Sequence, residues 1–267
     1  MSALTGRHAL ITGAGSGIGA AIARALADAG AAVSLAGRRP APLEAVAAQL
    51  PKAKAIVADV TRQIDCETMA LAARNAHGPI DIVIANVGGA ESASFKETDQ
   101  MLWRRMIDVN LTGAFFTVKA TIDDVTRTTR PDDITLTAPD PYRSRRIIFV
   151  ASTAGLKGYP YVAAYTAAKH GLIGLMRSLA AEFATKNVTV NAVCPGYTET
   201  PMLERSITTI TTKTGRTSDE ARSTLARSNP QGRIIKPAEV AQTVLWLCSP
   251  EAAGINGQAI SISGGEV

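Results

Sequence analysis

Tyr165 and Lys169, four residues apart, are the residues of this chain whose types and spacing best suit proton transfer. In a helix, positions i and i+4 share one face, so the phenol and the ammonium would point towards the same space. A free tyrosine titrates at about pH 10, but a neighbouring cation favours the phenolate and lowers that pKa. The pair suits a general acid or base, although a surface tyrosine and lysine on an amphipathic helix would show the same spacing.

A glycine-rich segment, Thr12–Gly19, follows the apolar run HALIT (8–12) and precedes an alanine-rich run typical of a helix. Glycines let the backbone approach a pyrophosphate, whose charge then lies at the positive N-terminus of the next helix. The order of strand, turn and helix favours a dinucleotide site over a simple tight turn. The spacing is T-G-x-x-x-G-x-G and differs from the common G-x-G-x-x-G.

The elements that must position these groups alternate along the chain. Short apolar runs predict strands, Ala-rich segments between them predict helices, and their alternation indicates an α/β fold with a parallel sheet covered on both faces. The predicted strands are 8–12, 32–36, 55–58, 80–85, 146–151, 188–193 and 259–262. The predicted helices include 20–29, 42–50, 64–76, 99–119, 162–185 and 237–248.

Two segments interrupt this alternation. Residues 123–145 are polar, contain three prolines and separate a predicted helix from the next strand; connections of this length are usually functional or mobile. Residues 197–232 follow a strand and fall where ligands bind in such folds, beyond the carboxyl ends of the strands. We predict a single domain over 1–267, with an insertion near 123–145 and a substrate loop near 197–232.

Composition limits the classes of partner. The chain has 267 residues, 46% of them hydrophobic, and a net charge of +5, which suits an acidic ligand such as a phosphate without requiring nucleic acid. Aromatic residues make up only 4%, too few to suggest a platform for stacking bases. We therefore predict no nucleic-acid partner.

Cysteine and histidine are scattered. Cys66, Cys194 and Cys248 include no C-x-x-C pair, which argues against a disulfide framework and a zinc site, and we predict no metal. The N-terminus lacks the apolar core of a signal peptide, and no apolar run approaches the length of a membrane span. These features predict a cytoplasmic protein without membrane contact.

Further motifs follow in a fixed order, and together with the glycine-rich segment and the Tyr–Lys pair they make the chain resemble the short-chain dehydrogenase/reductase family over essentially its full length. The resemblance implies a Rossmann-type doubly wound sheet of about seven strands, and departures such as Val87 in place of the usual Ala should alter packing more than chemistry. The motifs are Asp59-Val60, Asn86-Val87-Gly88, Asn110, Ser152 thirteen residues before Tyr165, and Pro195-Gly196 with Thr200.

The family's catalytic tetrad maps onto Asn110, Ser152, Tyr165 and Lys169. By this resemblance, Tyr165 exchanges a proton with the carbonyl or alcohol oxygen, and Ser152 orients that oxygen. Lys169 lowers the pKa of Tyr165 and binds the nicotinamide ribose, and Asn110 holds a water for proton relay. Taken singly, Asn110 would also suit a backbone tie in a helix, and Ser152 a cap at a strand end.

The resemblance also implies a bound NAD(P), with Asp59-Val60 at the adenine. Gly37 stands where an NAD-specific site commonly has a carboxylate, and Arg38 follows, so the sequence slightly favours NADP over NAD. Arg38 stacked flat on adenine would permit either cofactor. The implied cofactor contacts are Gly13, Ser16, Ile18, Gly19, Arg38, Arg39, Asp59, Val60, Asn86, Gly88, Tyr165, Lys169, Pro195, Gly196, Thr198 and Thr200.

The expected activity is interconversion of a ketone and a secondary alcohol. The predicted pocket walls, 89–95, 154–156, Tyr159 and 197–210, are small, apolar and aromatic, which suits a small, fairly apolar and even aromatic substrate. The alternative substrate is a 3-oxoacyl thioester on CoA or acyl carrier protein, and a more remote alternative is a non-catalytic dinucleotide-binding sensor. The resemblance further implies a homo-oligomer, commonly a tetramer.

Overall fold

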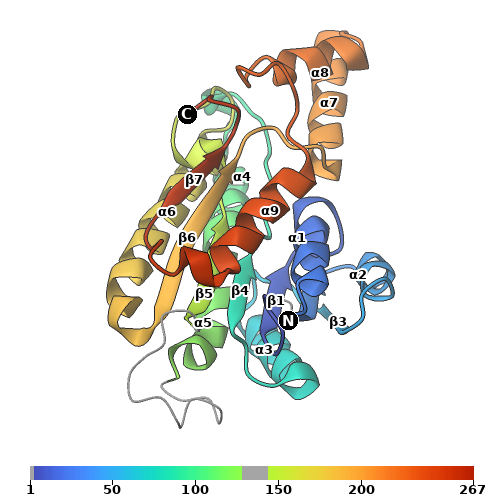
Figure 1. The fold of residues 1–267 in the computed structure, drawn as a ribbon. Coiled ribbons are helices and arrows are strands. Elements are labelled where there is room, and N and C mark those ends of the chain that lie inside the picture. Colours follow the sequence, from blue (N-terminus) through green and yellow to red (C-terminus); the bar gives the residue numbers. More distant parts are fainter. Residues whose placement is uncertain (1–2, 128–143) are drawn as a thin grey trace.

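The sheet contains seven parallel strands within the described residues, in the order β3-β2-β1-β4-β5-β6-β7. The computed structural model describes residues 3–127 and 144–267. In the central pairs of strands, Leu10 lies opposite Ser34 in one neighbouring strand and opposite Val83 in the other. This topology confirms the predicted Rossmann-type fold (Figure 1). The strands are β1 (His8–Thr12), β2 (Ala32–Gly37), β3 (Ala53–Val57), β4 (Ile82–Ala85), β5 (Arg145–Val150), β6 (Val188–Pro195) and β7 (Ala259–Ile262).

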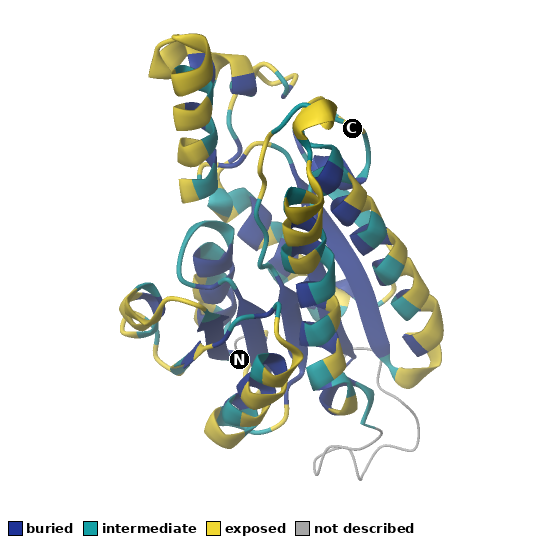
Figure 2. Ribbon diagram, turned by 180° about the vertical axis from the view of Figure 1, so that it is seen from behind, coloured by how far each residue is buried: buried dark blue, intermediate teal, exposed yellow. Residues whose placement is uncertain are grey.

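Helices cover both faces of the sheet, which is why its central strands are continuous buried runs (Figure 2). One apolar core lies between the sheet and α1, α2 and α9, and the other between the sheet and α3, α5 and α6. The helices are α1 (Gly17–Asp28), α2 (Pro40–Ala47), α3 (Gln63–His77), α4 (Gln100–Ile107), α5 (Gly113–Thr126), α6 (Ala163–Phe183), α7 (Pro201–Thr214), α8 (Ser218–Ala226) and α9 (Pro237–Cys248).

The prediction of one regular α-helix over residues 99–119 is wrong, because a π-helical turn interrupts the segment. It comprises α4, a π-helical turn at Asp108–Thr112 and α5. The side chain of Asn110, within this turn, donates to the backbone oxygens of Met106 and Gly89. A side chain that bonds nearby backbone competes with regular helical hydrogen bonding, and π turns occur frequently at functional sites.

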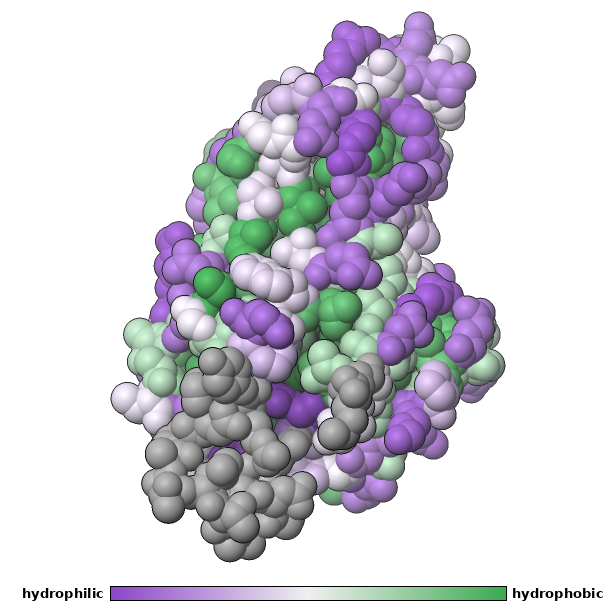
Figure 3. All heavy atoms as spheres, viewed as in Figure 1, coloured by the Kyte–Doolittle hydropathy of each residue, from purple (hydrophilic) through white to green (hydrophobic). Residues whose placement is uncertain are grey.

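The predicted substrate loop, 197–232, is largely helical. It contains α7 and α8, which share a small core of Leu203, Ile207, Ala221 and Leu225, extend beyond the sheet in Figure 1, and carry mostly hydrophilic side chains in Figure 3. The predicted insertion lies mainly outside the described residues, because α5 continues to Thr126 and β5 begins at Arg145. Among the residues that the structure describes, no helix has the length and apolarity needed to cross a membrane.

Candidate active site

The glycine-rich turn between β1 and α1 is shaped by close backbone approaches. Gly13 and Gly17 have positive φ values of 68° and 55°, which glycine adopts without strain. A Cβ atom on Gly19 would lie 2.3 Å from the oxygen of Gly13, so only glycine fits there. Ser16 caps α1 in extended conformation, and its side chain makes no capping bond. The first turn of α1 therefore presents backbone amides that suit a phosphate.

Asn86, directly after β4, holds this turn in place. Its side-chain nitrogen donates to the oxygen of Thr12 at 2.8 Å, and its backbone nitrogen donates to the Thr12 hydroxyl at 3.0 Å. Ile18, also a predicted cofactor contact, is packed against the core beneath α1. Asn86 thus holds the glycine-rich turn in place, a structural role in addition to the cofactor contact predicted for it.

The predicted adenosine contacts lie at the carboxyl ends of β2 and β3. Arg38 and Arg39 are exposed directly after β2. Asp59 accepts hydrogen bonds from the backbone and hydroxyl of Thr61 at 3.0 and 2.8 Å. Val60 is buried and packs against Gly113, where a Cβ atom would lie 2.7 Å from Val60 Cγ2. The two arginines therefore have the water-facing position that a charged ligand group requires.

The four tetrad residues come from three elements, namely the π-helical turn, α6 and the turn after β5, and two of the four meet near Gly88. Asn110 and Lys169 are 0% and 2% exposed. A Cβ atom on Gly88 would lie 2.9 Å from Asn110 Oδ1 and 3.3 Å from Lys169 Nζ, so both side chains reach the same point. Lys169 Nζ also donates to the oxygen of Val150 at 3.0 Å and lies 5.7 Å from the ring centre of Tyr165. Ser152, in the turn after β5, lies close enough to Tyr165 to lower the pKa of its phenol.

The electrostatics of the protein alone correct one expectation. Burial raises the pKa of Tyr165, and the hydrogen bond with Ser152 lowers it only in part. Burial also lowers the pKa of Lys169 from 10.5 to about 8. The expectation that the ammonium holds the phenol pKa below its usual value is therefore wrong for the protein alone, because desolvation dominates both groups.

The loop after β6 closes the site from the opposite side. Pro195 ends β6, the backbone nitrogen of Gly196 donates to Ile262 at 3.1 Å, and Thr198 Oγ1 donates to the oxygen of Gly196 at 2.9 Å. Thr200 caps α7 and touches the first turn of α1, since a Cβ atom on Gly17 would lie 3.0 Å from Thr200 Cγ2. The loop and the glycine-rich turn are thus in direct contact.

A polar cluster beside Ser152 was not predicted. Glu266, whose side chain is 3% exposed, accepts a hydrogen bond from the Tyr159 hydroxyl at 2.6 Å and pairs with Lys157 Nζ at 3.1 Å. Tyr159 was expected only as a pocket wall. The one sequence signal is an isolated acidic residue after two glycines.

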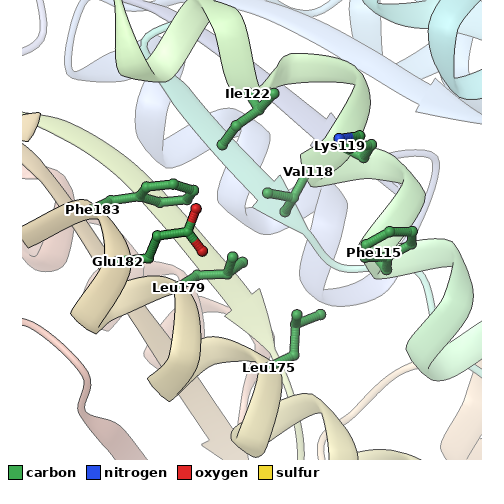
Figure 4. A pocket seen from close by; sticks show the side chains of 8 residues that line it. All are labelled: Phe115, Val118, Lys119, Ile122, Leu175, Leu179, Glu182 and Phe183. Carbon is green, nitrogen blue, oxygen red and sulfur yellow. The ribbon is translucent and has the colours of Figure 1, made fainter.

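A separate groove runs between α5 and α6 (Figure 4). None of its lining residues is a predicted site residue. In the described ranges 3–127 and 144–267, no group of three or more His, Cys, Asp or Glu side chains is arranged to hold a metal ion. The groove is lined by Phe115, Val118, Lys119, Ile122, Leu175, Leu179, Glu182 and Phe183.

Comparison with known proteins assigns the chain to one protein family. Residues 7–210 match the family model described as short chain dehydrogenase. Nodulation protein G of Rhizobium sp. (strain N33) is 36% identical over 99% of this chain and 98% of its own length. The 3-oxoacyl-[acyl-carrier-protein] reductase FabG of Thermotoga maritima is 34% identical over 99% of both chains.

Solved structures agree in fold over nearly the whole chain. An actinorhodin polyketide ketoreductase variant with NADPH has a TM-score of 0.88, with 32% identity and 97% of each chain covered. Levodione reductase has a TM-score of 0.89, with 28% identity and 98% of each chain covered. A 3-ketoacyl-(acyl-carrier-protein) reductase from Brucella melitensis, complexed with NADH, has a TM-score of 0.84 with 29% identity, and covers 98% of this chain and 99% of its own.

Proposed function

Because this chain belongs to the short-chain dehydrogenase family, we propose that it is an NAD(P)-dependent oxidoreductase that interconverts a ketone and a secondary alcohol. One observation supports the proposal: Asn110 and Lys169 meet beside Gly88, Lys169 lies next to the Tyr165 ring, and Tyr165 interacts with Ser152, at the edge of the sheet that also holds the glycine-rich turn. A bound nicotinamide would supply the hydride. The side chains of the protein then have to bind, orient and move a proton.

Tyr165 is the proton donor to the carbonyl oxygen in this proposal. Its raised pKa keeps the phenol protonated at neutral pH, as a general acid for reduction must be. Ser152, which lies beside the phenol, would share the same carbonyl oxygen. Because Lys169 has a pKa near the neutral range, at about 8, it can exchange a proton as well as bind ribose hydroxyls.

Asn110 positions the machinery behind Lys169. Its amide is bonded at both ends to the backbone of Gly89, at 3.1 Å for Oδ1 and 2.8 Å for Nδ2, which fixes the segment that follows β4. Gly88 lies between Asn110 Oδ1 and Lys169 Nζ. The predicted relay water would sit against these polar atoms and connect Lys169 to solvent.

A small, fairly apolar ketone remains our leading substrate, and the name of levodione reductase, a structural neighbour, fits it. A 3-oxoacyl thioester is the second candidate, favoured by relatives named as ketoacyl and 3-oxoacyl reductases and by the net charge of +5, which would attract an acidic carrier. A non-catalytic sensor would lack turnover altogether. The presence of all four tetrad side chains argues against that function.

We propose NADP as the preferred cofactor because Arg38 is exposed after Gly37, where it can pair with a 2′-phosphate. The named structural neighbours include complexes with NADPH and with NADH, so the family alone does not decide. A homotetramer and a cytoplasmic location are also our proposals. The groove in Figure 4, with Phe115 45% exposed, is a suitable contact between subunits, which molar mass in solution tests.

The deciding experiment compares initial rates on a panel of alkyl and aryl ketones with the rate on acetoacetyl-CoA, each with NADPH and NADH. Turnover of the ketones with a higher kcat/KM than the thioester supports our leading function. A preference for the thioester supports the second. Absence of turnover on every compound, with cofactor binding intact in calorimetry, would leave only the sensor.

A further inference from the structure

Glu266 is a buried carboxylate that the proposed chemistry does not use. Its side chain is 3% exposed, and its Oε1 atom is 2.6 Å from the Tyr159 hydroxyl and 3.1 Å from Lys157 Nζ. Burial of a carboxylate is costly unless it is paired and hydrogen-bonded. These two partners belong to the turn between β5 and α6, which also carries Ser152. Glu266 thus joins the C-terminal segment to the proposed catalytic turn.

Tyr159 extends this contact towards Ser152. Its hydroxyl lies 2.7 Å from Thr153 Oγ1 as well as 2.6 Å from Glu266 Oε1. A carboxylate can only accept, so the single phenol proton goes to Glu266 and the Thr153 hydroxyl donates to the phenol oxygen. Burial and the charge of Glu266 raise the pKa of Tyr159, which keeps this proton in place. The three groups therefore form an ordered chain of hydrogen bonds.

Thr153 is the residue directly after Ser152 and begins a short 3₁₀ turn, Thr153–Gly155. Ser152 Oγ accepts from the backbone nitrogen of Ala154 at 3.1 Å, so the serine hydroxyl is part of the same turn. On the other side the turn presses on α6, because a Cβ atom on Gly155 would lie 2.8 Å from the oxygen of Lys169. The turn is held between α6 and the chain that ends at Glu266.

The same carboxylate touches the loop after β6. A Cβ atom on Gly196 would lie 3.3 Å from Glu266 Oε2. Burial and the charge of Glu266 also raise the pKa of Tyr197, the next residue. Glu266 therefore contacts both loops that flank the proposed nicotinamide position.

We propose that Glu266 is a positioning residue, whose carboxylate fixes the Ser152 hydroxyl through Tyr159 and Thr153. This inference rests on the proposed function, in which Ser152 orients the reacting carbonyl oxygen. Misplacement of a reacting group by a fraction of an ångström to 1 Å lowers rates by up to roughly 10²-fold. The effect should fall mainly on turnover, since the orientation of the reacting oxygen by Ser152 matters most in the transition state.

The test uses the full chain and five variants. Glu266→Ala removes the acceptor and should lower kcat by roughly tenfold, with substrate KM within about twofold of wild type and cofactor Kd unchanged. Glu266→Gln keeps an oxygen acceptor for Tyr159 and should restore most of kcat. Tyr159→Phe should match Glu266→Ala, and the double variant should be no slower than either, because the groups act in one chain. Lys157→Met, which removes the ammonium but keeps the hydrogen bond between Tyr159 and Glu266, is the matched control.

Several results would overturn the proposal. Equal loss in Glu266→Gln and Glu266→Ala would assign the effect to charge, and a change confined to KM would make Glu266 a pocket wall. Additive losses of kcat in the double variant would show that Glu266 and Tyr159 do not act through one chain of hydrogen bonds.

Amide hydrogen exchange, measured without substrate, separates this proposal from the proposed function. Faster exchange at residues 152–157 in Glu266→Ala but not in Glu266→Gln supports the positioning role of Glu266 even if no ketone is turned over. Unchanged exchange in both variants rejects it.

Discussion

The two ends of the proposed cofactor site differ in how the protein holds its side chains. At the catalytic end, Asn110 and Lys169 are 0% and 2% exposed and bonded to backbone atoms. At the adenosine end, Arg38 and Arg39 are exposed at the edge of the sheet. The buried end is held by hydrogen bonds within the protein, whereas the two arginines at the other end are exposed to solvent. Substitutions should therefore have large effects at the first end and small ones at the second.

The largest effect is expected for Tyr165→Phe. Loss of one hydroxyl leaves the ring packing intact and should reduce kcat by about 10²- to 10⁴-fold, the usual contribution of a general acid. Cofactor Kd and the melting temperature should stay near wild type. The matched control is Tyr161→Phe at a 67% exposed position. Retention of more than roughly a tenth of wild-type kcat would remove Tyr165 from the mechanism.

Lys169→Met should have the next largest effect, because one ammonium serves two purposes in the proposed site. We expect kcat to fall by roughly 10²-fold and cofactor Kd to rise by about tenfold, as a charged hydrogen bond to ribose is lost. Steady-state rates and calorimetric titration measure the two effects separately. Lys52→Met, at an exposed position, is the control, and an unchanged cofactor Kd would contradict the ribose contact.

Asn110→Ala tests whether the buried end is fixed by its hydrogen bonds. The substitution leaves the backbone of Gly89 and the oxygen of Met106 without their side-chain partner. We expect the free energy of unfolding to fall by about 1–3 kcal/mol, measured by urea denaturation. Asn75→Ala, on an exposed face of α3, should change it little. Equal effects would show that the π turn does not depend on Asn110.

The burial of Lys169 also predicts a dependence of stability on pH. Its pKa is about 8 in the folded protein against 10.5 ordinarily, so between these values the unfolded chain binds the additional proton. The free energy of unfolding then rises with pH through this window, by at most about 1.4 kcal/mol per unit. Urea denaturation of the wild type and of Lys169→Met, measured between pH 8 and 9.5, separates the contribution of Lys169 to this slope from that of the tyrosines. The same slope in the variant would reject the assignment.

The smallest effect is expected at the exposed end. Arg38→Ala should lower the ratio of kcat/KM for NADPH over NADH by about fivefold, since an exposed ion pair contributes at most about 1 kcal/mol. Arg39→Ala, one residue along, shows whether the two arginines share the task. A wild-type preference for NADH, or a ratio unaffected by both substitutions, would mean that neither reads the 2′-phosphate.

The fold was predictable because a parallel sheet buried on both faces leaves continuous apolar runs in the sequence. The bounds of β1, β7 and α9 agree with the predicted 8–12, 259–262 and 237–248. The convergence of Asn110 with Lys169 was implied by the family resemblance alone, since no local pattern relates these positions.

Other features depend on tertiary contacts that sequence patterns do not contain. The π turn contains Asn110, whose side chain bonds Gly89, 21 residues away, whereas the local sequence is typical of a continuous helix. Tyr159 and Glu266 are 107 residues apart, beyond any periodic pattern. The raised pKa of Tyr165 reflects its desolvation, which the spacing of Tyr165 and Lys169 could not reveal.

The parallel sheet also gives the molecule two different ends, or poles: one where the strands end and one where they begin. The strands all run in one direction, so the turns that carry Gly13, Ser152 and Gly196 gather at one pole. Residues 127 and 144, which flank the segment outside the described ranges, join the fold at the end of α5 and the start of β5, at the opposite pole. A fluorophore or an affinity peptide grafted between them would be attached far from the chemistry, which makes this the natural position for a reporter.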